Sequence, residues 1–400
     1  MRRFLPICLL ACFPLACASV AAQQAPIPTA TALSGNPFFV KKSWPIGGSG
    51  NWDYLTMDPA TRRLYIAHGH AVQVVDVDSG SVVAEIPGFR DAHAIALDDT
   101  GQYGYVSDGP ANAVTVFDRS ALRAKATIPI GCSPRFIVFE PRSKLVFAFC
   151  PPQPGQRPVS PGNTNFSLIV AIDTEKNTVV TNVELSGDFH VAQADGYGGI
   201  YASAVQPSRV AKIDAVGLAA EAQRCAAASS TKNPCDRAHF DWSKNGSSLG
   251  LLQNIPLHSS CLDPQGLAVD GKNQRLFIAC QNQGVEVLNA KTGDIVASLT
   301  TGPGDDVIGY DPERELIYSA NGGGYGSLTI IQQDANTDSY AAIQNLPTLA
   351  RARTLAVDPS SGAVYLVTDL HGVDLTKMGG IGTLHFDPIP GSFQVLVVGH

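Results

Sequence analysis

The sequence predicts an all-β protein, a seven-bladed β-propeller whose blades are four-stranded antiparallel sheets. Residues 261–299 hold four apolar runs of four to six residues, with Gly, Asn or Asp in the turns between them. Runs of this length are too short for ordinary helices and are typical of strands joined by hairpins. One such meander cannot cover both of its faces, so it needs copies beside it.

Seven such units follow one another along the chain. An acidic residue opens the turn between the first and second strands of each unit, and a proline follows it in four of them. Proline at that place presets a type I turn. The units recur at steps of 40 to 75 residues, whereas an open β-solenoid usually has shorter repeats. The acidic residues are Asp58, Asp98, Glu140, Asp195, Asp270, Asp311 and Asp358.

The chain begins with a predicted secretory signal peptide, residues 1–22. A basic start, a short apolar region and small residues before Gln23 are its features. Residues 9–12 resemble a lipoprotein cleavage box, which keeps lipidation open as an alternative. Residues 23–37 form an expected flexible lead-in, and no later run is long enough for a membrane helix. We therefore expect a periplasmic or secreted protein.

The ring is expected to close through the N-terminal strand. Residues 38–46 precede the first unit, and the last unit lacks an obvious fourth strand. An N-terminal strand beside residues 393–398 completes that blade and removes the exposed sheet edges. The alternative pairs residues 383–386 and 393–398 as the third and fourth strands. The propeller would then comprise residues 38–400 as one domain.

Two insertions interrupt the repeat. Residues 151–163 are rich in proline and are expected to form a loop between the second and third strands of blade three. Residues 216–247 are expected between the third and fourth strands of blade four, with a short helix at 217–229. Strand direction places the first insertion on the face that carries the blade-to-blade loops and the second on the opposite face or the rim.

The cysteines predict three disulfides in an oxidising compartment. Two of the pairs occupy equivalent places, before the first strand and at the end of the second, where the ends of a hairpin lie side by side. The third pair falls inside the second insertion, and a cysteine metal site is the rival interpretation. The predicted pairs are Cys132 with Cys150, Cys225 with Cys235, and Cys261 with Cys280.

Charge argues against nucleic acid as a partner. The net charge is −7 and no basic cluster occurs outside the signal peptide, whereas phosphate binding needs clustered Lys and Arg. We expect a monomer whose partner is a small molecule or another protein.

Two segments resemble the YVTN-type β-propeller repeat proteins, the YncE-like group. They are residues 52–59 with 63–65 (WDYLTMDP and RLY), and residues 266–270 with 275–278 (GLAVD and RLFI). The resemblance runs from about residue 38 to residue 399 and implies an exported seven-bladed propeller. It implies no single reaction, because similar propellers serve as binding modules, lactonase-like enzymes and redox accessory proteins. The insertions and the weak fourth repeat depart from the regular pattern.

The candidate site is the channel mouth, reached by residues just before each first strand and at the ends of second strands. His, Asp and Arg side chains from different blades suit a small polar or anionic ligand, although they can also simply solvate the mouth. The candidates are Asp53, His68, His93, Arg135, His190, Gln265, Asp306 and Arg353.

The alternative function is a lactonase-like hydrolase or lyase. His93 or His190 would act as the general base, and Arg135 or Arg353 would hold an anionic substrate. A metal on His68, His93 and His190 would assist it, and a calcium site at Asp53, Asp306 and Asn321 is a further alternative. The sequence carries no Gly-x-Ser-x-Gly or His-Glu-x-x-His motif, so catalysis and cofactors stay open and we favour binding.

Overall fold

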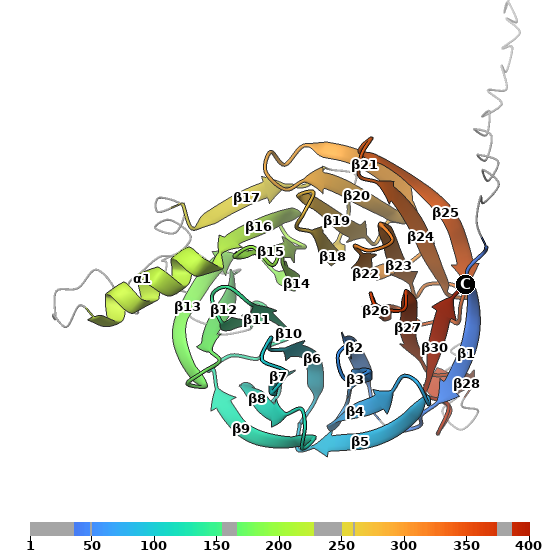
Figure 1. Cartoon of the computed structure of the whole chain (residues 1–400), viewed down its shortest axis with the longest axis horizontal. Coiled ribbons are helices and arrows are strands. Elements are labelled where there is room, and N and C mark those ends of the chain that lie inside the picture. The colour runs from blue at the N-terminus through green and yellow to red at the C-terminus, as the bar shows by residue number, and fades with distance from the viewer. Residues whose placement is uncertain (1–35, 49, 154–165, 228–249, 259–260, 374–385) are drawn as a thin grey trace, which may run out of the picture.

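Seven four-stranded antiparallel sheets stand around a central axis and form a closed β-propeller (Figure 1). The computed structural model describes residues 36–48, 50–153, 166–227, 250–258, 261–373 and 386–400. The predicted fold class is confirmed. The predicted signal peptide lies outside the described residues, and its cleavage stays a prediction.

Six blades follow the chain in order from the axis outwards. Blade one has β2 (Trp52–Asp58), β3 (Arg63–His68), β4 (Ala71–Asp76) and β5 (Ser81–Pro87). Blade two has β6 (Ala92–Leu97), β7 (Tyr103–Asp108), β8 (Ala113–Asp118) and β9 (Arg123–Pro129). Blade three has β10 (Phe136–Glu140), β11 (Leu145–Cys150), β12 (Phe166–Asp173) and β13 (Thr178–Ser186). Blade four has β14 (Phe189–Ala194), β15 (Gly199–Ala204), β16 (Arg209–Asp214) and β17 (Leu252–Pro256). Blade five has β18 (Pro264–Asp270), β19 (Arg275–Cys280), β20 (Gly284–Asn289) and β21 (Ile295–Thr300). Blade six has β22 (Asp305–Asp311), β23 (Leu316–Asn321), β24 (Ser327–Asp334) and β25 (Ser339–Pro347).

Blade seven joins the two ends of the chain, as predicted. Its order is β26 (Thr354–Asp358), β27 (Ala363–Thr368), β30 (Gln394–Gly399) and then β1 (Phe39–Pro45). The N-terminal strand β1 is antiparallel to β30, with Trp44 opposite Val395. The third strand is therefore β30, so the alternative without the N-terminal strand is wrong. A small hairpin of β28 (His371–Val373) and β29 (Phe386–Pro388) stands between β27 and β30.

The second strands form the densest part of the core. Every residue of β11, β15 and β23 is buried, because both faces of these strands pack against neighbouring blades. The outermost strands behave differently. In β5, exposed and partly buried residues alternate, which is the period of a strand with one face towards solvent.

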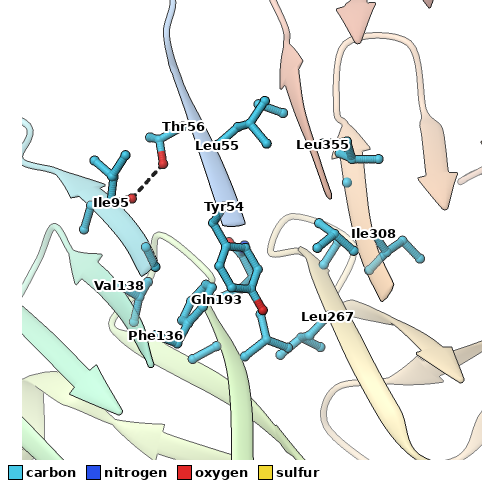
Figure 2. A pocket seen from close by; sticks show the side chains of 18 of the residues that line it. Tyr54, Leu55, Thr56, Ile95, Phe136, Val138, Gln193, Leu267, Ile308 and Leu355 are labelled. Carbon is cyan, nitrogen blue, oxygen red and sulfur yellow. Dashed lines mark hydrogen bonds between the residues drawn. The ribbon is translucent and has the colours of Figure 1, made fainter. Parts of the chain in front are cut away.

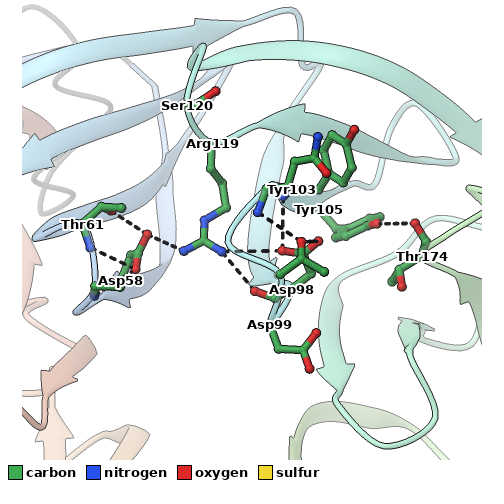
Figure 3. A network of polar contacts seen from close by, with 12 residues as sticks. Asp58, Thr61, Asp98, Asp99, Tyr103, Tyr105, Arg119, Ser120 and Thr174 are labelled. Carbon is green, nitrogen blue, oxygen red and sulfur yellow. Dashed lines mark hydrogen bonds and ion pairs between the residues drawn. The ribbon is translucent and has the colours of Figure 1, made fainter.

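The acidic turns act as predicted. Each of their carboxylates accepts backbone N–H groups of its own turn, as Asp58 does from Ala60 (3.2 Å) and Asp358 from Ser360 (3.0 Å). Three of these carboxylates, Asp58, Asp270 and Asp358, also bind a group of the neighbouring blade. Figure 3 shows Arg119 between two of the acidic turns: its Nη2 lies 2.5 Å from Asp58 Oδ2, and its Nη1 donates to the backbone oxygen of Asp98 (3.0 Å).

Both insertions begin between the strands where they were expected. The proline-rich one begins after β11, where the Gln153 amide donates to the Ser133 carbonyl (3.4 Å) at the mouth end of blade three. The second begins with helix α1 (Ala215–Ala227), between β16 and β17. Ala215 N–H donates to the Gly198 carbonyl (2.9 Å) in a first-to-second-strand turn, so α1 starts on the face opposite the mouth. Among the described residues no helix is long and apolar enough to cross a membrane.

Two predicted disulfides are confirmed. Cys132 bonds to Cys150 and Cys261 to Cys280, each across the mouth end of a hairpin. The predicted Cys225–Cys235 pair depends on residues outside the described part of the chain and stays a prediction.

Candidate functional site

A channel with a volume of about 400 Å³ runs along the propeller axis (Figure 2). All seven first strands line it, from β2 through β26. Each of these strands is the innermost of its sheet, so its unpaired edge of backbone N–H and C=O groups faces the channel. Such groups need polar partners, which suits the channel to water and hydrophilic solutes rather than to an apolar ligand.

Seven of the eight predicted site residues occupy equivalent positions, one in each blade. They stand at the second residue of a first strand or directly before it. The first strands contact one another in chain order and close between β26 and β2, so these residues encircle the mouth in that order. We call this set the mouth ring: Asp53, His93, Arg135, His190, Gln265, Asp306 and Arg353.

Six members of the mouth ring pair with a neighbour. His93 Nδ1 lies 2.5 Å from Asp53 Oδ2, and His190 Nδ1 lies 2.9 Å from Gln265 Oε1. Arg353 Nη1 lies 3.5 Å from Asp306 Oδ2. A ring of seven members cannot pair completely.

Arg135 is the remaining member. Its side chain is exposed and has no carboxylate partner among the described residues. It lies within electrostatic range of His93, His190 and the Tyr54 hydroxyl. Arg135 therefore presents a guanidinium group at the mouth with its donors available among the described residues.

The surroundings of His93 favour its imidazolium form. The hydrogen bond to Asp53 raises the pKa of His93, against the opposing effect of burial, and Asp91 lies 3.8 Å from the other ring nitrogen. Arg135 partly counters this rise.

The second histidine has a similar environment. Burial lowers the pKa of His190, but attraction to Asp188 and Gln265 outweighs it, so the pKa is raised. The Gln265 amide nitrogen donates to Asp263 (2.7 Å), which leaves its oxygen facing His190. Asp188 lies 3.2 Å from His190 Nε2. Both ring nitrogens thus face acceptors, as an imidazolium requires.

Asp306 is a largely buried carboxyl of the mouth ring. Burial raises its pKa to about 6; Arg353 opposes this rise, and Asp53 reinforces it. The Arg353 guanidinium also lies over the ring of buried Trp52, 5.3 Å from its centroid, and Arg351 lies 6.0 Å from it. Trp52 therefore holds both arginines at the blade seven side of the mouth.

Tyr54 lies below the mouth ring and crosses the channel. Figure 2 shows its ring between the side of Phe136 and that of Leu267 and Ile308, which belong to other blades. It meets Phe136 edge to face, with 4.8 Å between centroids. Burial, together with Asp53 and Asp306, raises the pKa of Tyr54 well above its ordinary value, so the hydroxyl stays a neutral donor.

His68, the eighth predicted residue, is not part of the mouth ring. It is buried at the end of β3, where its Nδ1 faces Gln73 Oε1 (2.9 Å) and its ring packs on Phe393 (4.1 Å between centroids). Asn321 is likewise buried, and it donates to Ser327 and Thr329. No group of three His, Cys, Asp or Glu residues suited to a metal gathers in the described ranges, so the proposed histidine set does not assemble.

Two features of the mouth escaped the sequence reasoning. In the sequence Tyr54 belongs to a repeat motif, and no local pattern marks it as a channel residue. The second feature is a set of three aspartates, each two residues before a ring member and in contact with it. Asp91 contacts His93, Asp188 contacts His190, and Asp263 contacts Gln265. The sequence carries a signal for this feature. An Asp-x-His or Asp-x-Gln pattern stands at the same position of the repeat in blades two, four and five.

Comparison with known proteins supports the fold alone. No known family profile and no curated protein matches the chain. A chain of hydrazine synthase from Kuenenia stuttgartiensis superposes with a TM-score of 0.56 at 17% identity, covering 78% of this chain and 91% of that one. The WD40 repeats of RRP9 give 0.63 at 9% identity, covering 90% and 97%. A chain of the mitotic checkpoint complex gives 0.61 at 13% identity, covering 90% and 96%. At these identities the similarity identifies a β-propeller and no particular activity.

Proposed function

We propose that this protein binds a small polar or anionic ligand at the mouth ring without transforming it. The observation that carries the proposal is Arg135, an exposed guanidinium without a carboxylate partner among the described residues, in a ring whose other members are paired. Guanidinium groups bind carboxylates and other oxyanions through paired N–H donors. His93 and His190 on either side add positive charge when protonated.

A thermal-shift assay tests this proposal. Succinate and inorganic phosphate serve as probes, with wild type compared with Arg135→Gln. We expect at least one probe to raise the melting temperature of wild type, because a ligand that binds only the folded state stabilises it. The Arg135→Gln variant should lose at least tenfold in affinity, since charge-assisted hydrogen bonds contribute roughly 1.5–3 kcal/mol each.

Arg90→Gln is the matched control. Arg90 is an exposed arginine that donates to the Pro110 carbonyl (3.2 Å) at the same end of blade two, and it is not a member of the mouth ring. This variant should bind as wild type does. Equal binding by Arg135→Gln and wild type would refute the proposal, as would the absence of stabilisation by both probes.

A second candidate is a hydrolase or lyase that uses His93 as general base. The specific observation in its favour is the Asp53–His93 contact of 2.5 Å, since a carboxylate on Nδ1 orients a catalytic imidazole. Arg135 nearby would hold an anionic substrate. Hydrolysis of lactone probes by wild type, lost in both Asp53→Asn and His93→Gln, would support this candidate. Ligand binding without turnover would support the binding proposal.

We also propose that the protein is exported and belongs with the YVTN-type propellers. Two disulfides support an oxidising compartment. The closed seven-bladed ring supports membership in a propeller family but does not single out this one. Fractionation of expressing cells, with mass measurement of the mature N-terminus, tests export and the predicted cleavage together.

A further inference from the structure

The mouth ring is electrically polarised. His93, Arg135 and His190 stand in three consecutive blades, two, three and four, and form its cationic arc. Asp91 faces His93 and Asp188 faces His190, whereas Arg135 has no carboxylate partner among the described residues. Asp53 and Asp306 stand in blades one and six, on the other side of the ring. Asp53 is paired with His93, and Asp306 is paired with Arg353 of blade seven at 3.5 Å.

The cationic arc and the two carboxylates, the two poles of the ring, exert their electrostatic effects on the same part of the channel. The Tyr54 side chain crosses the channel just below the ring (Figure 2). Its hydroxyl lies within electrostatic range of both Arg135 and Asp306. In the order of blades, Arg135 and Asp306 are separated by two blades on one side and by three on the other. They are thus nearly opposite each other, with Tyr54 between them.

A simple anion satisfies only half of this site. It would pair with Arg135, but Asp53 and Asp306 act on the same mouth, since all three lie within electrostatic range of Tyr54. Asp306 is largely buried, with 21% of its side chain exposed, and its nearest cation, Arg353, lies 3.5 Å away. A positive group of a ligand would stabilise the charge of this carboxylate further than Arg353 does alone, because buried charges require partners.

We propose that the mouth ring selects a small zwitterion, a compound with a carboxylate and an ammonium group such as an amino acid. The carboxylate lies at Arg135 and the ammonium at Asp306, and the neutral Tyr54 hydroxyl donates to the ligand between them. This inference rests on the proposed binding function and names its ligand class.

The test compares amino acids with carboxylates of the same length that lack the ammonium. Glycine, γ-aminobutyrate and ε-aminocaproate are paired with acetate, butyrate and caproate, and affinities are measured by calorimetry on the intact mature protein. Because the amino group moves along the series, the best length reports the separation of the two poles. We expect one amino acid to bind at least tenfold more tightly than its matched carboxylate.

Variants assign the poles. Arg135→Gln should weaken both compounds of the best pair, whereas Asp306→Asn should weaken only the amino acid and so remove the preference. Arg90→Gln should change neither. Binding of carboxylates with no preference for any amino acid would overturn the zwitterion inference and leave the proposed function standing. A preference that survives in Asp306→Asn would also overturn it. Failure of every compound to bind would overturn the zwitterion inference, and the proposed function would then be decided by succinate and inorganic phosphate.

Discussion

Arg119 offers the sharpest test of how the blades hold together, through the variant Arg119→Met. The guanidinium joins blade two to blade one, and its side chain is only 6% exposed (Figure 3). It lies 2.5 Å from Asp58 Oδ2 and 3.6 Å from Asp98 Oδ1, and both aspartates are buried. Methionine keeps much of the length and apolar bulk of the side chain but leaves two buried carboxylates without their cation.

The expected cost is large for one substitution. At an effective dielectric constant of about 20, a pair of charges roughly 4 Å apart contributes about 4 kcal/mol of Coulomb energy. Removing one partner of a buried ion pair typically costs about 3–5 kcal/mol. Thr61 still donates to Asp58 (2.6 Å) and compensates part of the loss, so we expect about 3 kcal/mol.

The effect should depend on pH. Burial raises the pKa of Asp58, but hydrogen bonds from Arg119 and Thr61 outweigh it, so the pKa is lowered in the folded protein. A lowered carboxyl pKa stabilises the fold above the ordinary value near 4, and that stability is lost as the pH falls through the folded value. The deficit of Arg119→Met should therefore be largest near neutral pH and shrink under acid conditions.

Urea unfolding followed by tryptophan fluorescence measures this deficit. Lys144→Gln is the control, because Lys144 and Asp99 form an exposed ion pair between blades two and three, with expected loss below about 1 kcal/mol. A deficit below about 1 kcal/mol for Arg119→Met, or one that stays constant between neutral and acid pH, would refute the reasoning.

Three further predictions concern other parts of the molecule. Replacing Cys132 and Cys150 by serine should cost about 3 kcal/mol in the same unfolding assay, because the bond closes a loop with a sequence separation of 18; an unchanged urea midpoint would contradict this. The pKa of His93 is raised by Asp53, so its contribution to stability is present below the ordinary histidine pKa and lost as pH rises through the folded value. The destabilisation caused by His93→Gln should accordingly be greater at pH 5 than at pH 9, and NMR titration of the imidazole checks the direction of the shift. Gly266→Ala should destabilise the ring and disturb ligand binding, because an added Cβ would lie 2.4 Å from a backbone oxygen of blade six; wild-type thermal stability would refute this.

The repeat pattern determined most of the fold because it is local. Apolar runs and acidic turns recur within each unit, and an incomplete last unit with a spare N-terminal strand has one economical closure, which β1 provides beside β30. The same repeat alignment placed the mouth ring, since equivalent positions in a closed ring face the same axis. Cys132 and Cys150 were predictable for this reason also.

What the repeat could not determine is which of those equivalent residues interact. His68 follows the rule for mouth residues, yet it turns into the core, where Gln73 and Phe393 hold it. A repeat specifies a backbone position, whereas the rotamer of a side chain depends on neighbours that come from other blades.

The sequence by itself determined the number of blades, the closure of the ring and seven repeat-equivalent positions at its mouth. Only the tertiary structure decided that six members of the mouth ring are paired, that Arg135 is left with its donors available, and that Tyr54 crosses the channel beneath them. The physical reason is that hydrogen bonds and charge interactions act over a few ångströms between blades tens to hundreds of residues apart in the chain. Periodicity within one blade carries no information about them.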